Sequence, residues 1–429
     1  MSWSVPARTA PPSPGLRLRL ATVMGDLAAG LSRLAGRGSG ASIRGQVIAR
    51  LAPGAFADLL RGRKILAVSG TNGKTTTTHL LAAAVRAGLG DAADRLVTNA
   101  DGANLHYGIA SALSQAPRAD IAVLETDERV VGDLIATGAP QVLVFLNFSR
   151  DQLDRHHEIK ALGRAWRTAL EKAGKAGPVI VANASDPLVV WSSSTAAEVI
   201  WVETDTQWSA DGALCPACGA ILMRVRVEAG RDHWDCPGCE LTQPEASYVV
   251  TGDAIRLPGG ETVTPQLRVP GRFNLSNAAC ALAAAVHFGI DPQTALTGMA
   301  TVTAPAGRYA TAQFGTTRAR LLLAKNPAGW AEALPLAASD PVVLAIDAVA
   351  ADGKDVSWLW DVDYEQLAGR QVIATGPRAQ DLAVRLSYAE VAHTVVPDLT
   401  EALAGHGGTV DVISTYTPFQ RLLKMAGLR

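Results

Sequence analysis

The stretch GTNGKT, residues 70–75, decides the fold that we predict for this 429-residue chain. It joins an apolar segment, Ile65 to Val68, which predicts a buried strand, to a helical pattern from Thr75 to Gly88. In such a loop glycines let backbone amides turn toward phosphate oxygens, lysine offsets phosphate charge, and a threonine hydroxyl can bind Mg²⁺. The general P-loop pattern has glycine where Val68 stands, but the strand-to-helix junction favours a phosphate site over a structural turn. We therefore expect ATP as a cofactor.

Strand and helix patterns alternate on either side of the chain's midpoint. After the loop, apolar runs at Ile121 to Leu124, Val142 to Leu146 and Val179 to Val181 predict buried strands, and Ile159 to Gly174 predicts a helix. This alternation predicts a parallel sheet with helices on both faces. A second series begins near Arg320 and comprises Leu321 to Ala324, Val342 to Ile346, Val372 to Ala374, Thr394 to Val396 and Val410 to Ile413.

The two series predict an α/β protein of several domains. Residues 1–60 form a tail with a helical segment, residues 61–303 a central ATP-binding domain, and residues 304–429 a C-terminal Rossmann-like α/β domain. The best linker candidate is the stretch from Thr303 to Gly307, which contains proline and glycine.

Charge argues against a nucleic-acid partner, and hydropathy argues against a transmembrane segment. The 39 basic and 40 acidic side chains leave no basic surplus for a nucleic-acid backbone. No apolar run reaches the roughly 18 residues that a transmembrane helix needs. We expect a cytoplasmic protein with no transmembrane segment and no nucleic-acid partner.

The N-terminal segment shows an amphipathic pattern. Apolar residues recur there at helical spacing: Leu20, Val23, Met24, Leu27, Leu31 and Leu34. We expect a short helix and favour one packed on the protein's own body over one that lies on a membrane surface.

Polar residues follow two of the predicted strands. Glu125, Thr126, Asp127 and Glu128 come directly after Ile121 to Leu124, and a polar cluster from Asn147 to His157 follows the next strand. The carboxyl ends of parallel strands form the ligand-binding edge of a sheet, where oxygen ligands for magnesium are needed. Glu125 is the best magnesium candidate, against the alternative of solvated loop charges.

Four cysteines form a second motif. Cys215 and Cys218 make one CxxC pair, and Cys236 and Cys239 make another after 17 residues. This spacing lets four thiolates surround one Zn²⁺, which would be structural because no coordination position stays open. Disulfides are the alternative that a reducing compartment disfavours. Cys280 lies in an apolar helical pattern, which favours core packing.

Several motifs together resemble the Mur ligase family from about residue 40 onward. They are residues 70–76, Asn147 to His157, Asn183 to Pro187, and Gly271 to Ala279. The Cys-rich insert, at about residues 205–245, and the segments Lys325 to Gly329 and Asp352 to Asp363 are similar to the family's lipid II amidating group. The resemblance implies a central P-loop ATPase domain with a Cys₄ zinc-ribbon insert and a C-terminal α/β domain. It also implies ATP-dependent amidation of the α-carboxyl of D-glutamate in lipid II during peptidoglycan synthesis. Ammonia would come from a separate glutaminase subunit of the GatD type. The lipid II substrate would be met at the inner face of the plasma membrane.

The resemblance also assigns roles to individual residues. It places Lys74 and Arg308 at the transferring phosphoryl group, and Thr75, Glu125 and His156 at magnesium. It gives Asp355 to a Cys-His-Asp triad whose cysteine and histidine belong to the glutaminase. The nucleotide contacts that it implies are Gly70, Thr71, Asn72, Gly73, Lys74, Thr75, Thr76, Asn183 and Asn274.

A carboxylate must be activated before ammonia can replace its oxygen, and an acyl phosphate supplies a good leaving group. The five cysteines include no credible glutaminase nucleophile, so we expect ammonia from another chain. Trp358 and Trp360, near Asp355, are expected to be exposed interface anchors, with core packing as the alternative. A stand-alone ligase that adds an amino acid and a non-enzymatic ATP-binding scaffold remain rival hypotheses.

Overall fold

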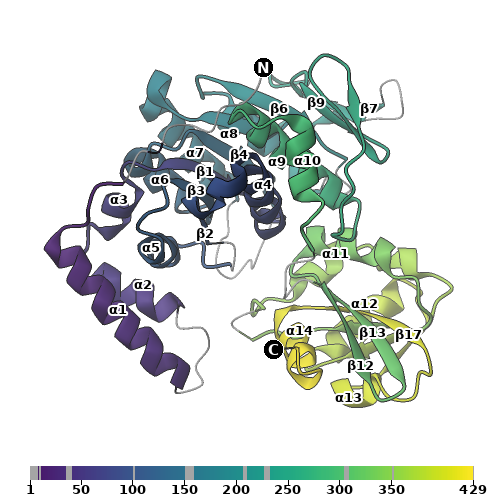
Figure 1. The fold of residues 1–429 in the computed structure, drawn as a ribbon. Helices are drawn as coiled ribbons and strands as arrows, with labels where there is room; N and C mark the ends of the chain where they lie inside the picture. The colour runs from purple at the N-terminus through teal and green to yellow at the C-terminus, as the bar shows by residue number, and fades with distance from the viewer. Residues whose placement is uncertain are drawn as a thin grey trace.

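The computed structural model describes residues 8, 11–34, 41–99, 102–149, 159–205, 210–226, 232–303, 309–349 and 352–428. Two α/β bodies follow one another along the chain, and a group of N-terminal helices lies at the outer edge of the first body (Figure 1). The first body runs from β1 to α10, and the second runs from β12 to α14.

A nine-stranded sheet forms the centre of the first body. Its strand order is β11-β10-β9-β6-β5-β4-β1-β3-β2, with parallel pairing from β2 to β9 and antiparallel pairing from β9 to β11. The strands are β1 Lys64–Ser69, β2 Leu96–Thr98, β3 Ile121–Glu125, β4 Val142–Phe145, β5 Val179–Asn183, β6 Val199–Glu203, β9 Tyr248–Thr251, β10 Ala254–Arg256 and β11 Thr262–Val263.

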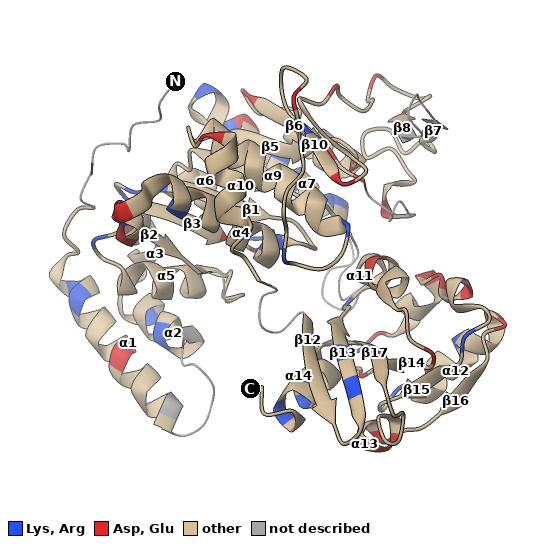
Figure 2. Cartoon of the chain, turned by 45° about the vertical axis from the view of Figure 1, so that its right-hand side comes forward, with Lys and Arg blue, Asp and Glu red and all other residues tan. Residues whose placement is uncertain are grey.

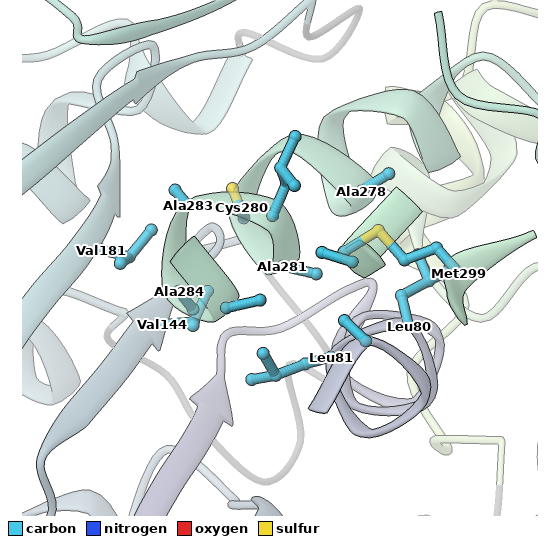
Figure 3. Packing of buried hydrophobic residues seen from close by; sticks show 14 of the residues in the cluster. Leu80, Leu81, Val144, Val181, Ala278, Cys280, Ala281, Ala283, Ala284 and Met299 are labelled. Atoms are coloured by element: carbon cyan, nitrogen blue, oxygen red, sulfur yellow. The ribbon is translucent and has the colours of Figure 1, made fainter. Parts of the chain in front are cut away.

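Helices cover both faces of this sheet, which confirms the predicted arrangement. Successive residues of β1 enter different cores: Leu66 and Val68 pack with α4 and α9, whereas Ile65 and Ala67 pack with the helices opposite. Figure 3 shows Leu80 and Leu81 of α4 beside the alanine-rich α9. One face carries α4 Lys74–Leu89, α9 Phe273–His287 and α10 Pro292–Met299. The other carries α5 His106–Gln115, α6 Val131–Gly138, α7 Ile159–Ala173 and α8 Pro187–Ser193. The 3₁₀ turns η1 Gly90–Arg95 and η2 Gly174–Ala176 follow α4 and α7 along the chain.

A six-stranded sheet forms the second body, with the order β12-β13-β17-β14-β15-β16. Only the β12–β13 pair is antiparallel among its pairings. Its elements are β12 Tyr309–Phe314, β13 Thr317–Leu323, α11 Pro327–Ala333, η5 Leu334–Leu336, β14 Val342–Ala345, η6 Ser357–Asp361, η7 Tyr364–Leu367, β15 Val372–Thr375, α12 Ala379–Tyr388, β16 His393–Val395, α13 Leu399–Ala402, β17 Thr409–Ser414 and α14 Tyr416–Met425.

The N-terminal helices are α1 Leu16–Leu34, α2 Ala41–Leu51 and α3 Ala55–Leu60. The sequence correctly predicted a helix at α1, but the apolar residues of the predicted pattern do not pack on the protein's own body, although Leu18 does. Leu20, Leu27 and Leu31 are exposed, whereas small residues such as Ala21 and Ala29 face inward. Among the described residues, no helix is long and apolar enough to cross a bilayer.

The cysteine-bearing insert between β6 and β9 contains a two-stranded antiparallel ribbon, β7 Met223–Arg226 and β8 Asp232–Asp235, and a short 3₁₀ turn, η3 Ala210–Gly212. Trp234 is fully buried between the ribbon and the central body, and its indole N–H donates to the Ala184 carbonyl. This contact fixes the ribbon on the body's surface.

Candidate active site

A cavity of about 500 Å³ lies where the two bodies meet. The central body supplies residues 71–76, the segments after β3 and β4, and the start of α9. The C-terminal body supplies Tyr309, Lys325 and Gly329, and the insert supplies Arg224. The cavity is therefore built by three separate parts of the chain.

Residues 70–76, which we call the phosphate loop, take a conformation that requires glycine. Gly70 and Gly73 have φ values of +137° and +84°. A Cβ atom on Gly73 would lie 2.4 Å from the side-chain oxygen of Asn277, and one on Gly70 would lie 2.9 Å from the Asn147 nitrogen. At both positions the positive φ and the close neighbours therefore exclude any residue that has a side chain. The loop leads into the first turn of α4, whose N–H groups have no partner within the helix and suit an anion.

Polar groups after β4 fix the phosphate loop in place. The side chain of Asn147 accepts a hydrogen bond from Asn72 N at 2.8 Å and donates to Asn72 O at 3.1 Å. Thr71 N donates to Asn147 O at 2.9 Å, and Ser149 N donates to the Thr71 hydroxyl at 3.0 Å. Val68, which occupies the general P-loop glycine position, is a fully buried strand residue. The loop therefore begins after Val68, at the end of β1.

Lys74 lies under the phosphate loop with its ammonium group directed at oxygen atoms. Nζ donates to Gly70 O at 2.5 Å and to Thr71 O at 3.2 Å. It also pairs with the Glu128 carboxylate at 3.3 Å, and both side chains are nearly buried. The ammonium group of Lys74 therefore lies against the phosphate loop with the carboxylate of Glu128 beside it.

Glu125 ends β3 next to β1, and its geometry suits a cation ligand. Oε1 accepts a hydrogen bond from Asn104 Nδ2 at 2.9 Å, whereas Oε2 is buried with no hydrogen-bond partner. A buried carboxylate oxygen without a donor is costly, and a divalent cation would satisfy it. Thr75, at the start of α4, lines the same cavity and is the other described candidate for this ion. His156, the third predicted ligand, lies outside the described residues, as does Arg308.

The two asparagines predicted at the adenine region line the cavity but use their side chains internally. Asn183 donates to Leu146 O at 2.9 Å and accepts from Ser185 N and the Thr204 hydroxyl. Asn274 accepts from Asn277 Nδ2 at 2.9 Å and donates to the Pro270 carbonyl. Both side chains therefore shape the cavity wall.

Asp355 lies on a separate surface of the C-terminal body, just before η6. Its carboxylate is partly exposed and accepts a hydrogen bond from Ser357 N at 2.8 Å, which lowers the pKa of Asp355. The expectation that both tryptophans are exposed is wrong for Trp358, which is buried and packs 6.0 Å from the Trp330 ring. Trp360 is 54% exposed and contacts Tyr388. Of the two tryptophans, Trp360 alone can serve as a surface anchor.

The four cysteines of the insert converge as their spacing predicted. The Sγ atoms of Cys215, Cys218, Cys236 and Cys239 all lie within 4.8 Å of one another. Four sulfurs bound to one Zn²⁺ at about 2.3 Å would be about 3.8 Å apart, which this cluster approaches. No other such metal-type cluster occurs within the part of the chain that the structure describes. Cys280 is buried in α9, where burial raises its pKa to about 12, so the predicted core packing is confirmed.

Several residues that the structure brings to the cavity had no individual role assigned from the sequence. Glu128 pairs with Lys74, and Asn326 exchanges amide contacts of 3.4 Å with Asn72 of the phosphate loop. Asp186 caps α8 and accepts a hydrogen bond from Phe148 N, and burial raises its pKa to about 6. Glu128 and Asn326 belong to motifs visible in the sequence, but a motif does not tell which of its residues face one another.

Comparison with protein families and relatives agrees with this geometry. Residues 68–213 match the family described as "Mur ligase middle domain", and residues 323–419 match "MurT ligase C-terminal". The chain is 29% identical over 385 residues to the "Lipid II isoglutaminyl synthase (glutamine-hydrolyzing) subunit MurT" of Staphylococcus aureus (strain COL), covering 84% of this chain and 86% of the relative. The protein of that name from Streptococcus pneumoniae is 29% identical over 397 residues, covering 86% and 87%.

Solved structures show the same fold at lower identity. A pseudomurein peptide ligase type C from Methanothermus fervidus superposes with a TM-score of 0.61 at 17% identity, covering 87% of this chain and 81% of that one. A UDP-N-acetylmuramoylalanyl-D-glutamyl-2,6-diaminopimelate–D-alanyl-D-alanyl ligase from Acinetobacter baumannii gives 0.62 at 15% identity, covering 89% and 80%. These two likenesses show the fold alone.

Proposed function

This chain belongs to the Mur ligase family of ATP-dependent ligases, and from that premise we propose that it amidates the α-carboxyl of D-glutamate in lipid II to give D-isoglutamine. It would act as the synthetase subunit of a glutamine-hydrolysing complex in peptidoglycan synthesis, on the cytoplasmic side of the membrane. One observation carries the proposal: the phosphate loop faces the C-terminal domain of the MurT type, with Asn72 against Asn326 at 3.4 Å.

The chain's residues suit transfer of the γ-phosphoryl group of ATP to a carboxylate. The phosphate loop and the start of α4 would hold the triphosphate, and Lys74 would stabilise charge on the transferred group. Our sequence assignment adds Arg308 at the γ-phosphate. The product is an acyl phosphate, and the nitrogen of ammonia attacks its carbonyl carbon, expels phosphate and loses a proton to give the amide.

Two metal ions complete the proposal. Thr75 and Glu125 would hold Mg²⁺, with His156 assigned from the sequence as a further metal-linked residue; the unpaired Oε2 of Glu125 supports this site. The ion would neutralise phosphate charge. Cys215, Cys218, Cys236 and Cys239 would hold a structural Zn²⁺ that stabilises the insert.

Ammonia would come from a glutaminase subunit of the GatD type. All five cysteines of the chain are accounted for: four lie in the cluster and Cys280 is buried with a raised pKa, so none suits glutamine hydrolysis. We propose that Asp355 orients and stabilises a histidine of that partner. Its partly exposed carboxylate supports this role, and the low pKa keeps it ionised at neutral pH.

Reconstitution with and without the glutaminase tests the proposal. Lipid II, ATP and either glutamine or ammonium chloride are supplied, and the product is weighed by mass spectrometry. We expect replacement of a carboxyl by an amide with ammonium alone, and with glutamine only when the glutaminase is present. Coupling of an amino acid without a partner would support a stand-alone ligase instead. Absence of substrate-dependent phosphate release would support a scaffold.

A further inference from the structure

The outer face of α1 carries large apolar residues that nothing in the described structure covers. Seven of them are 51% to 87% exposed. At 100° per residue they fall within an arc of about 100° on the helix surface. We call this set the apolar stripe: Leu16, Leu20, Val23, Met24, Leu27, Leu31 and Leu34.

The inner face of α1 has the opposite character. Ala21, Gly25 and Ala29 are buried against α2, and a Cβ atom on Gly25 would lie 3.1 Å from Arg44 O. A helix at a protein surface usually turns its large apolar residues toward the core. Here Leu18 is the one large apolar residue among the described side chains of α1 that packs inward, beside small residues, whereas the apolar stripe faces outward; packing within the chain therefore does not explain the stripe.

Two arginines flank the N-terminal end of the apolar stripe. Arg17 and Arg19 lie on either side of it by helical position, and they donate to the backbone oxygens of Leu51 and Pro14. Residues 16–51 contain six arginines against the single acidic residue Asp26, a formal charge of +5, although the whole chain carries −1. Arginine segments appear in blue on both α1 and α2 in Figure 2.

A buried arginine holds α1 in a fixed position. The Arg44 guanidinium, on α2, donates to Asp26 of α1 at 2.6 Å and to Ser111 O of α5 at 2.6 Å. Gly45 lies so close to α5 that a Cβ atom would meet Tyr107 O. Helix α5 starts two residues after Asn104, the residue that donates to Glu125 in the candidate active site. The outer face of α1 is thus linked through packed elements to the catalytic cavity.

We propose that the apolar stripe and its arginines form a docking face for the surface of an anionic phospholipid bilayer. An apolar helix face flanked by cations inserts into the boundary between headgroups and acyl chains, and anionic lipids strengthen the attraction. A symmetric contact between two copies of the face would bring like-charged arginines together. Asp355, where we place the glutaminase, belongs to the C-terminal body, whose helix α12 lies on the opposite side of the view from α1 (Figures 1 and 2).

This inference deepens the proposed function, on which it rests for the lipid-linked nature of the substrate. The measurement itself does not depend on turnover. The full chain is floated with vesicles of phosphatidylcholine alone and with vesicles that also contain phosphatidylglycerol, at low and high salt. We expect binding to the anionic vesicles, weakened by salt because screening reduces the attraction.

Two variants and a matched control identify the face. The triple variant Leu20→Gln, Leu27→Gln and Leu31→Gln should bind anionic vesicles at least about tenfold more weakly, because three apolar side chains no longer leave water. Arg17→Gln with Arg19→Gln should reduce the salt dependence. The control, Val384→Gln with Tyr388→Gln, alters two exposed apolar residues of α12 and should bind as the wild type does.

Several results would overturn the proposal. Failure of the wild type to float with anionic vesicles would do so, as would unchanged binding by the triple variant. A dimer in solution that the triple variant abolishes would assign the apolar stripe to a second copy instead. Nucleotide binding serves as the folding control for the triple variant, and if it is lost the arginine variant decides. If the chain binds anionic vesicles but the reconstitution with lipid II gives no amide product, the proposed function is contradicted and this inference stands.

Discussion

The phosphate loop and the segment around Asp355 are built in opposite ways. The loop is fixed by the left-handed glycine conformations and by hydrogen bonds between Asn72 and Asn147, and Asn277 lies close against Gly73. Asp355 is partly exposed, and Ser357, two residues away, donates to it. Phosphoryl transfer needs groups that are already oriented, because reorganisation during the reaction would raise the barrier. A carboxylate that completes a site on another chain must instead remain accessible.

The largest effect that this comparison predicts is at Lys74. Lys74→Ala removes the cation from the phosphate loop and leaves Glu128 facing the triphosphate. We expect amidation to fall by about 10³-fold with both glutamine and ammonium, because stabilisation of the transferred phosphoryl group is lost. Steady-state rates of phosphate release measure the loss. Lys172→Ala, at an exposed position of α7, is the control, and equal rates for the two variants would remove the catalytic role of Lys74.

Asp355→Asn should separate the two nitrogen sources. We expect glutamine-dependent amidation to fall by about 10²-fold, since the partner's histidine loses the group that orients it and stabilises its cation. The ammonium-dependent rate should stay close to that of the wild type. Asp361→Asn, at an exposed position six residues later that ends η6, is the matched control. Equal loss with both nitrogen sources would place Asp355 in the synthetase reaction or in folding.

The insert should affect stability more than chemistry. Cys236→Ser should abolish bound zinc, as measured by metal analysis of the purified protein, because one of four ligands is lost. Activity should fall only several-fold, since the insert lines the cavity through Arg224 but is not part of the phosphate loop. Cys280→Ala should keep its zinc. Retention of full zinc content by Cys236→Ser would rule out the four-cysteine site.

The smallest effect on activity is expected at Asp411, inside the C-terminal sheet. Its carboxylate accepts from Arg320 at 2.6 Å and from the Ala338 and Ser339 amides. Burial alone would raise its pKa, but these donors outweigh burial and lower the pKa. The stabilisation is therefore present above the ordinary pKa of aspartate and disappears as pH falls through the lower folded value.

Asp411→Asn should lower the free energy of unfolding at neutral pH by about 1–3 kcal/mol. The difference from wild type should shrink in acid, and thermal unfolding at several pH values would measure it. Asp398→Asn, at an exposed helix cap, is the control for a carboxylate without this network. A difference that does not change with pH would contradict the ionised role of Asp411.

Much of the fold could be predicted from local patterns in the sequence. The strand at Val142 and the helix from Thr75 were predictable because buried strands and amphipathic helices leave a period in the sequence. The cysteine cluster was predictable because two CxxC pairs admit few other arrangements. Long-range contacts left no such mark. The exchange between Asn72 and Asn326 joins residues 254 positions apart, and no local pattern encodes it.

Burial was the property that the sequence conveyed least well. Trp358 and Trp360 are two residues apart, yet one is in the core and the other on the surface. The leucines of α1 gave a regular helical stripe, but periodicity cannot tell whether a protein core or another apolar medium faces it. In both cases the answer depends on which neighbours the fold supplies.

The contact of Lys74 with Glu128 has a consequence for the order in which ligands enter. Lys74 is paired with the carboxylate of Glu128, and the carboxylate of Glu125 lines the same cavity. The triphosphate of ATP without a metal ion would be repelled by these carboxylates. Nucleotide that arrives with its divalent ion brings compensating charge, so we expect the pocket to prefer the magnesium complex over uncomplexed ATP.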